Sequence, residues 1–86
     1  TITSTSPPQG VIVSLDSENR VFVNREETTI EELGRRAHEA LLESKQTSVV
    51  IRADKSVTYE RIFRAIESLK IAGVNQMRFA YEQQNL

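Results

Sequence analysis

The feature that most constrains the fold is the stretch 49–73, which reads VVIRADKSVTYERIFRAIESLKIAG. It opens with a nearly continuous apolar run, which is typical of a buried, central β-strand. A polar turn at Asp54 and Lys55 follows, and apolar residues then recur at helical spacing as far as Gly73. Glycine is typical just beyond a helix C-terminus, because it readily adopts the left-handed backbone conformation. The stretch therefore predicts a strand that leads through a short loop into an amphipathic helix.

The other segments supply partners for this strand and helix. Apolar residues alternate on either side of the polar stretch 16–20, which predicts a β-hairpin. A helix should follow, because Thr29 and Glu32 fit a capping box and Ile30, Leu33 and Leu41 form an apolar stripe. The predicted strands are residues 11–15, 21–23, 48–53 and 76–81, and the predicted helices are residues 28–44 and 57–72.

The order β-β-α-β-α-β predicts an α+β two-layer sandwich, with two helices packed on one face of a mixed β-sheet. Each strand–helix–strand unit should bring its two strands parallel. Gly34, inside the first helix, is expected to mark close packing of that helix on the sheet. The opposite sheet face would be less well covered, and an open strand edge makes a small domain a candidate for self-association.

The 86 residues divide into a linker and one domain. Residues 1–10 read TITSTSPPQG and offer little apolar surface, so they predict a flexible linker. Residues 11–82 form the predicted domain, and residues 83–86 a frayed tail. Because the chain begins at Thr1 without methionine, it is expected to be a fragment, with any targeting segment upstream.

Catalytic, cofactor and metal sites are not expected, so the protein is predicted not to be an enzyme. There is no cysteine, one histidine (His38) and no glycine-rich phosphate loop. Asp54 and Lys55 resemble an acid/base pair, but an aspartate capping the following turn is the favoured interpretation. Asp16 and Glu18 resemble part of a calcium loop, whose glycine and terminal glutamate are missing.

Nucleic-acid binding is disfavoured by a formal net charge of -1. RNA-recognition domains of similar size stack bases on aromatic residues of their central strands. The predicted central strand contains no aromatic residue, and Phe79 and Tyr81 lie on the last strand. A free-standing small domain that binds peptide or RNA nevertheless stays open as an alternative.

The segment Ile51-Arg52-Ala53-Asp54-Lys55-Ser56-Val57-Thr58-Tyr59, with the later Ala72-Gly73 pair, resembles the periplasmic domain of the ExbD/TolR family. The family pattern is a hydrophobic strand, an A-D-x-x-V-x-Y turn, a helix, an A-G pair and a final strand. The resemblance covers about residues 11–81, and the residues of the motif are more similar to ExbD than to TolR.

The resemblance implies a single-pass protein of the bacterial inner membrane, with this domain in the periplasm. ExbD proteins work with ExbB and TonB, using the proton-motive force to import siderophores and vitamin B12 through the outer membrane. TolR proteins work with TolQ and TolA to maintain the outer membrane. The family's proton-carrying aspartate lies in a transmembrane helix, so no residue of this chain inherits that role. Residues 1–10 would match the family's linker.

A tethered, non-catalytic domain with an open strand edge suits dimerisation and capture of an extended partner segment. The candidate surface is the last strand, with Met77, Phe79 and Tyr81 on one face and Arg78 on the other. The alternative, left open by the sequence, is that the three apolar side chains belong to the core under the helices. Tyr59 is interpreted as a packing residue.

Overall fold

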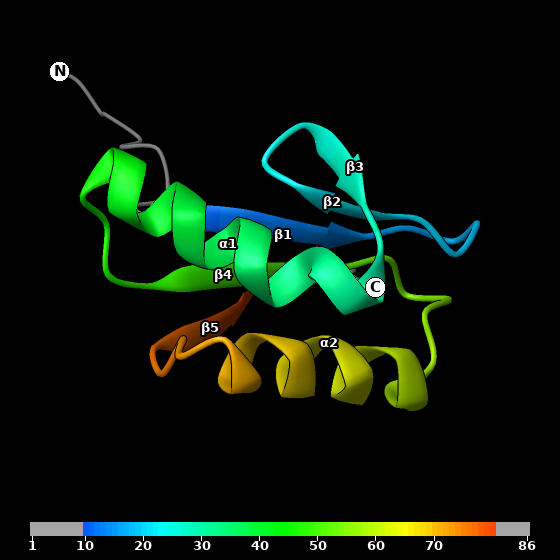
Figure 1. Cartoon of the computed structure of the whole chain (residues 1–86). Helices are drawn as coiled ribbons and strands as arrows, with labels where there is room; N and C mark the ends of the chain where they lie inside the picture. Colours follow the sequence, from blue (N-terminus) through cyan, green and yellow to red (C-terminus); the bar gives the residue numbers. More distant parts are fainter. Residues whose placement is uncertain (1–9, 81–86) are drawn as a thin grey trace, which may run out of the picture.

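The computed structural model describes residues 10–80, which form a mixed β-sheet with two helices (Figure 1). The order of the strands in the sheet is β3-β2-β1-β4-β5. Strands β1, β4 and β5 are parallel, whereas β2 is antiparallel to both of its neighbours. The elements are β1 (Val11–Leu15), β2 (Val21–Val23), β3 (Glu26–Thr28), α1 (Ile30–Ser44), β4 (Val49–Ala53), α2 (Tyr59–Ile71) and β5 (Met77–Ala80).

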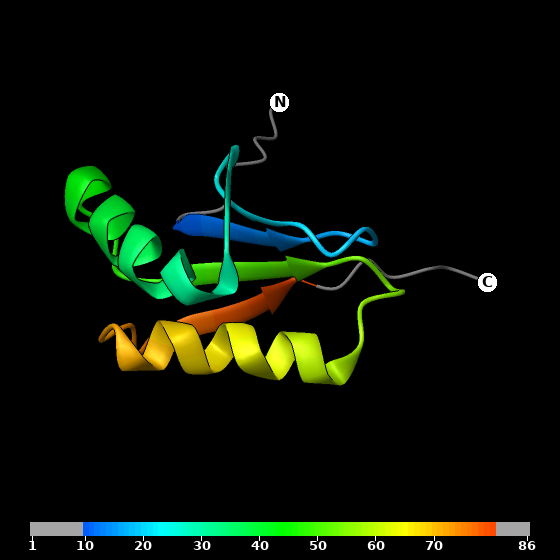
Figure 2. The same cartoon turned by 45° about the vertical axis from the view of Figure 1, so that its right-hand side comes forward.

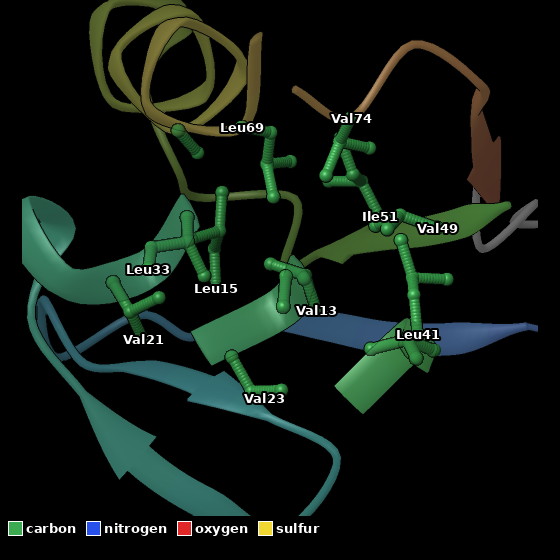
Figure 3. Close-up of a cluster of buried hydrophobic side chains, with 13 residues drawn as sticks. Val13, Leu15, Val21, Val23, Leu33, Leu41, Val49, Ile51, Leu69 and Val74 are labelled. Carbon is green, nitrogen blue, oxygen red and sulfur yellow. The ribbon is translucent and has the colours of Figure 1, made fainter. Parts of the chain in front are cut away.

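The core lies between the sheet and the helices, and strand alternation explains its composition. Val11, Val13 and Leu15 are buried, while the residues between them are half-buried and point to the opposite face. Leu33 of α1 and Leu69 of α2 pack into the same cluster (Figure 3). Both helices cover one face of the sheet, as the two cartoon views show (Figures 1 and 2). The predicted two-layer α+β architecture is therefore confirmed.

Hydroxyl side chains begin both helices. Thr29 Oγ1 accepts a hydrogen bond from the backbone N–H of Glu32 at 3.3 Å, which satisfies a free amide of the first turn of α1. Thr58 does the same for Arg61 at 3.3 Å. The predicted capping of α1 by Thr29 is confirmed, although each helix begins two residues later than predicted, at Ile30 and Tyr59.

The end of α2 has the predicted geometry. Gly73 has φ 101°, and its N–H donates to the carbonyl of Lys70 at 3.0 Å. The N–H of Val74 donates to the carbonyl of Leu69 at 2.9 Å, which completes a Schellman motif. Val74 and Leu69 are both buried in the core, so the chain turns directly from the helix end towards β5 (Figure 3).

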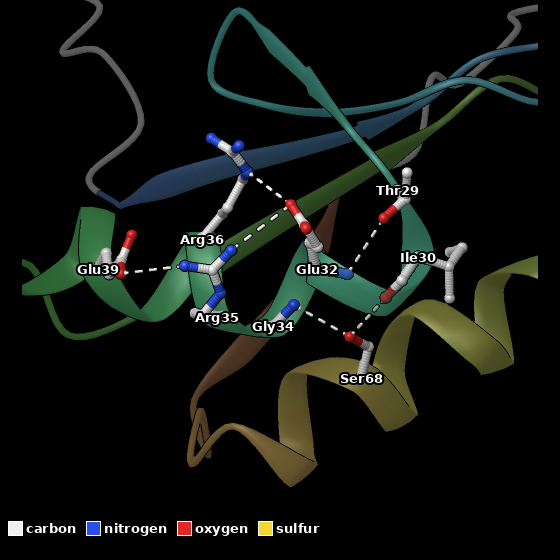
Figure 4. A network of polar contacts seen from close by, with 8 residues as sticks. All are labelled: Thr29, Ile30, Glu32, Gly34, Arg35, Arg36, Glu39 and Ser68. Carbon is white, nitrogen blue, oxygen red and sulfur yellow. Dashed lines mark hydrogen bonds and ion pairs between the residues drawn. The ribbon is translucent and has the colours of Figure 1, made fainter.

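Gly34 packs against the other helix and not, as predicted, against the sheet. A Cβ atom placed on Gly34 would lie 2.1 Å from the carbonyl oxygen of Ser68 in α2. The Ser68 hydroxyl accepts from the Gly34 N–H at 3.0 Å and donates to the Ile30 carbonyl at 2.8 Å (Figure 4). It thus bridges two backbone groups that a regular α-helix joins directly. Glycine is needed here because the two helix backbones approach closely.

Strand β3 was not predicted, and it changes the topology. Its residues Glu26 and Glu27 are exposed, so it lacks the apolar alternation that reveals a strand. The prediction that the strand 21–23 runs parallel to the one after the first helix is wrong, because β2 is antiparallel to β1 and β1 is parallel to β4. The extra reversal into β3 restores the direction before α1 begins.

The other boundaries shift by one or two residues. Thr28 ends β3 and does not begin the helix, and Ser48 lies just before β4. β4 is an interior strand between β1 and β5, and β1 occupies the middle of the sheet. The predicted linker, apart from Gly10, and the predicted tail lie outside the described residues. Tyr81 and Glu82, the last two residues of the predicted domain, also lie outside them.

Candidate functional site

The register of β5 places the sequence-predicted site residues on two faces of the sheet. Met77 lies beside Val49 and Phe79 beside Ile51, and both of these neighbours are fully buried under the helices. Met77 is half-buried against the core, whereas the Phe79 side chain keeps 43% of its surface exposed. Arg78 is exposed on the opposite face, where alternation directs it. Tyr81 lies outside the described residues.

A mostly apolar groove lies between α2 and the two strands β4 and β5. Its volume is about 540 Å³, within the usual range of binding pockets. Phe79 lies on the strand side of the groove, and Phe63 lies on the helix side. The lining residues are Ile51, Ala53, Asp54, Lys55, Val57, Tyr59, Ile62, Phe63, Ile66, Phe79 and Ala80.

The groove exists because α2 leaves part of its apolar side uncovered. Tyr59 is 89% exposed and Phe63 is 65% exposed, while Leu69 on the same helix is fully buried. The interpretation of Tyr59 as a packing residue is therefore wrong. Phe63 and Ile66 belong to the apolar helical repeat that the sequence predicted before Gly73, but their contribution to the groove was not predicted. In the structure, α2 fully buries only Ala65 and Leu69.

The loop at the mouth of the groove is organised by Asp54. Its Oδ2 accepts from the Ser56 hydroxyl at 2.6 Å and from the Ser56 backbone N–H at 3.0 Å. These hydrogen bonds hold the pKa of the Asp54 carboxyl below its ordinary value. The predicted role of Asp54 as a cap of the turn is confirmed.

Asp16 plays a similar part in the β1–β2 turn. Its Oδ2 accepts from Nε of Arg20 at 2.8 Å, and its Oδ1 accepts from the backbone N–H groups of Arg20 and Glu18. Desolvation opposes ionisation of Asp16, but these hydrogen bonds outweigh it and lower its pKa. Because Arg20 also pairs with Glu18 at 3.4 Å, the acidic groups of this turn are bound to a guanidinium.

The sheet face opposite the helices combines apolar and basic side chains. Ile12 lies beside Val50, and Val50 lies beside Arg78. Arg52 lies on the same face, since it occupies an alternate position of β4. Towards the other edge, the Arg20 guanidinium lies 5.8 Å from the ring centre of Phe22, within the range of a cation–π contact.

The described part of the chain offers neither a metal centre nor a membrane span. In residues 10–80, no three histidine, cysteine, aspartate or glutamate side chains gather closely enough to hold an ion. Over the same residues, neither helix has the length and apolar character needed to cross a bilayer.

Comparison with known proteins agrees with this description. The family model described as "Biopolymer transport protein ExbD/TolR" matches residues 2–84. The chain is 29% identical over 77 residues to a protein of Pseudomonas aeruginosa named "Biopolymer transport protein ExbD". That alignment covers 86% of this chain and 58% of the relative, so the chain spans little more than half of the relative's length.

Proposed function

The chain belongs to the ExbD/TolR family of biopolymer transport proteins, and from this premise we propose that it is the periplasmic domain of an ExbD-type energy transducer. Such a protein couples the proton-motive force, together with ExbB and TonB, to import of siderophores and vitamin B12 through the outer membrane. The name of the Pseudomonas relative and the ExbD-like sequence of residues 51–59 support this role over a TolR-type role with TolQ and TolA.

In this proposal the described domain binds and does not catalyse. It forms a homodimer and captures an extended segment of TonB in the periplasm, while ExbB contacts a transmembrane helix outside these residues. The observation that carries the proposal is the position of β5: it is the last strand of the described sheet and borders the apolar groove. A segment added beside β5 would gain main-chain hydrogen bonds and place alternate side chains against the groove.

Phe79 is the residue through which this surface is best tested. We expect Phe79→Ala to weaken binding of a TonB periplasmic fragment about tenfold, because aromatic anchors dominate such contacts. Binding is measured by NMR titration of the isolated domain, and circular dichroism checks that it stays folded. Leu42→Ala is the matched control, since Leu42 is 68% exposed on α1 and does not line the groove.

Unchanged binding in Phe79→Ala would overturn the proposed surface. If Phe79→Ala unfolds the domain, the core interpretation of Phe79 gains support, and Tyr59→Ala then carries the test. Tyr59 lines the groove but is 89% exposed, so its truncation should weaken binding without unfolding.

The membrane role is tested on the complete gene. We expect about 20 apolar residues with a single aspartate to be encoded upstream of Thr1, as a proton-coupled transmembrane helix requires. A gene that encodes only a cleavable signal upstream would contradict the transducer role and leave a free-standing peptide-binding domain.

A further inference from the structure

The two faces of the sheet differ in chemistry where β5 forms its edge. On the helix side, Met77 and Phe79 continue the apolar surface of Val49 and Ile51 into the groove. On the opposite side, Arg78 lies beside Val50, and Arg52 occupies the same face of the neighbouring strand. A side chain presented at this edge therefore meets an apolar surface on one face and guanidinium groups on the other.

These two guanidinium groups are not neutralised by the described part of the chain. Within residues 10–80, neither Arg52 nor Arg78 forms an ion pair, in contrast to Arg20 and Arg64. Asp16 and Asp54 line a small hollow with Arg52, but Asp16 is bound by Arg20 at 2.8 Å and Asp54 by Ser56 at 2.6 Å. Arg78 on the edge strand and Arg52 on the neighbouring strand thus form no ion pair with the described residues and could pair with an acidic partner.

We propose that the segment added beside β5 alternates apolar and acidic residues, and this inference rests on the proposed function of that edge. Successive side chains of a strand point to opposite faces of the sheet. The apolar residues of the partner would enter the groove beside Phe79, and its carboxylates would lie beside Arg78, within reach of the long Arg52 side chain one strand further in. The pattern holds for a parallel and for an antiparallel partner, because both alternate with the same period.

The same charges disfavour a second copy of β5 as the occupant. In an antiparallel pairing of two β5 strands about a two-fold axis, the two Arg78 residues lie opposite or diagonal, about 5–8 Å apart. Like charges at this distance destabilise a strand pair and lie within the Debye length at physiological salt. Charge therefore favours an acidic segment over a second copy of β5 as the partner of the β5 edge.

The opposite edge of the sheet repels the same partner. There β3 exposes Glu26 and Glu27, whose side chains alternate to the two faces of the sheet. An acidic segment would meet like charge on both faces of β3, whereas β5 itself carries one arginine and no acidic residue. Charge thus assigns the partner to one of the two edges.

The test compares three nine-residue peptides that alternate valine with glutamate, glutamine or lysine. They are titrated into the 86-residue chain, and NMR shifts of the β5 amides report binding at this edge. We expect the glutamate peptide to bind about tenfold more tightly than the lysine peptide, as two exposed ion pairs allow. The double variant Arg52→Glu, Arg78→Glu should reverse this order.

Arg25→Glu is the matched control. Arg25 lies between β2 and β3, so this variant also replaces an arginine by a glutamate, but at a distance from β5. The preference for the glutamate peptide should persist in this variant. Equal binding of the three peptides at β5, or a preference that survives the double variant, would overturn the inference while leaving segment capture intact. If none of the peptides shifts the β5 amides, the inference and the proposed role of that edge are both overturned.

Discussion

The two helices are similar in length and amphipathic character, yet they cover the sheet unequally. Helix α1 has 15 residues, and it lies against β1, β2 and β3 as well as α2. Helix α2 has 13 residues and packs chiefly on α1, leaving the groove between itself and β4 and β5. Of the large apolar side chains, α1 exposes Leu42, whereas α2 exposes Tyr59, Phe63 and Ile71.

The unequal coverage of the sheet by α1 and α2 gives the two halves of this small domain different properties. The half formed by α1 and the hairpin buries most of its large apolar side chains, whose burial stabilises the fold. The half formed by α2, β4 and β5 also contributes buried core residues, but it retains exposed apolar side chains along the groove, the surface to which the proposed function assigns binding. The comparison therefore predicts that equivalent substitutions have unequal effects in the two halves.

Truncation of one apolar residue on each helix gives the largest expected contrast. Leu33→Ala should lower the free energy of unfolding by about 3 kcal/mol, because Leu33 is fully buried and a cavity remains. Phe63→Ala should lower it by less than about 1 kcal/mol, because the side chain is 65% exposed. Urea denaturation measures both values. Equal losses would mean that α2 is packed as firmly as α1.

Gly34→Ala should disturb the close contact between α1 and α2 and lower the free energy of unfolding. The new Cβ would lie 2.1 Å from the Ser68 carbonyl oxygen, and relieving this overlap should cost about 3 kcal/mol. Alanine improves helix propensity by only about 1 kcal/mol, so a net loss of about 2 kcal/mol is expected in thermal or urea unfolding.

Gly73→Ala serves as the control for that substitution. Nothing lies within 4 Å of its Cβ position, so only the strain of φ 101° remains, about 1 kcal/mol. A larger loss at Gly73 than at Gly34 would contradict the close approach of the helices.

The helix ends offer a smaller, stabilising contrast. Helix α1 ends at Ser44 and is followed by Lys45 with φ 58°, a conformation that a residue with a side chain adopts at a cost. The left-handed residue after α2 is a glycine, Gly73. Lys45→Gly should raise the free energy of unfolding by about 0.5–1 kcal/mol. The neighbouring substitution Gln46→Gly should bring no such gain, and a loss at Lys45 equal to that at Gln46 would refute the argument.

The smallest expected effect is on pH dependence. Hydrogen bonds from Ser56 depress the pKa of Asp54 in the folded state, so ionised Asp54 stabilises the fold above the ordinary value of 3.8. This stabilisation falls as the pH drops from 3.8 through the lower folded-state pKa. Carboxyl NMR should show Asp54 titrating below 3.8, and Asp54→Asn should flatten the acid limb of the stability curve. Titration at or above 3.8 would contradict the turn geometry.

Local signals in the sequence predicted most of the fold. Capping by Thr29, the helix end at Gly73 and the apolar run of β4 each have a local physical cause, and all three are confirmed. The strand β3 could not be predicted, because its exposed glutamates pair only with β2 and bury nothing. The partner of Gly34 depends on how two helices meet, which no pattern within one helix specifies.

The candidate site was predictable only in part. Alternation placed Phe79 and Arg78 on opposite faces of the last strand, as the register shows. The groove depends on how α2 packs against α1 and the sheet, which the apolar pattern of α2 alone does not specify. For that reason Tyr59 was interpreted as packed although it is exposed.

The hydroxyl of Ser68 has a consequence for the opening motions of the domain. Because it bridges the Gly34 amide and the Ile30 carbonyl, a backbone linkage inside α1 runs through a side chain of α2 (Figure 4). Hydrogen exchange at the Gly34 amide therefore reports on the departure of α2 as well as on fraying of α1. The exchange rate of this one amide proton therefore depends on whether α1 and α2 open together or separately. A segment that binds in the groove and holds α2 in place should slow this exchange.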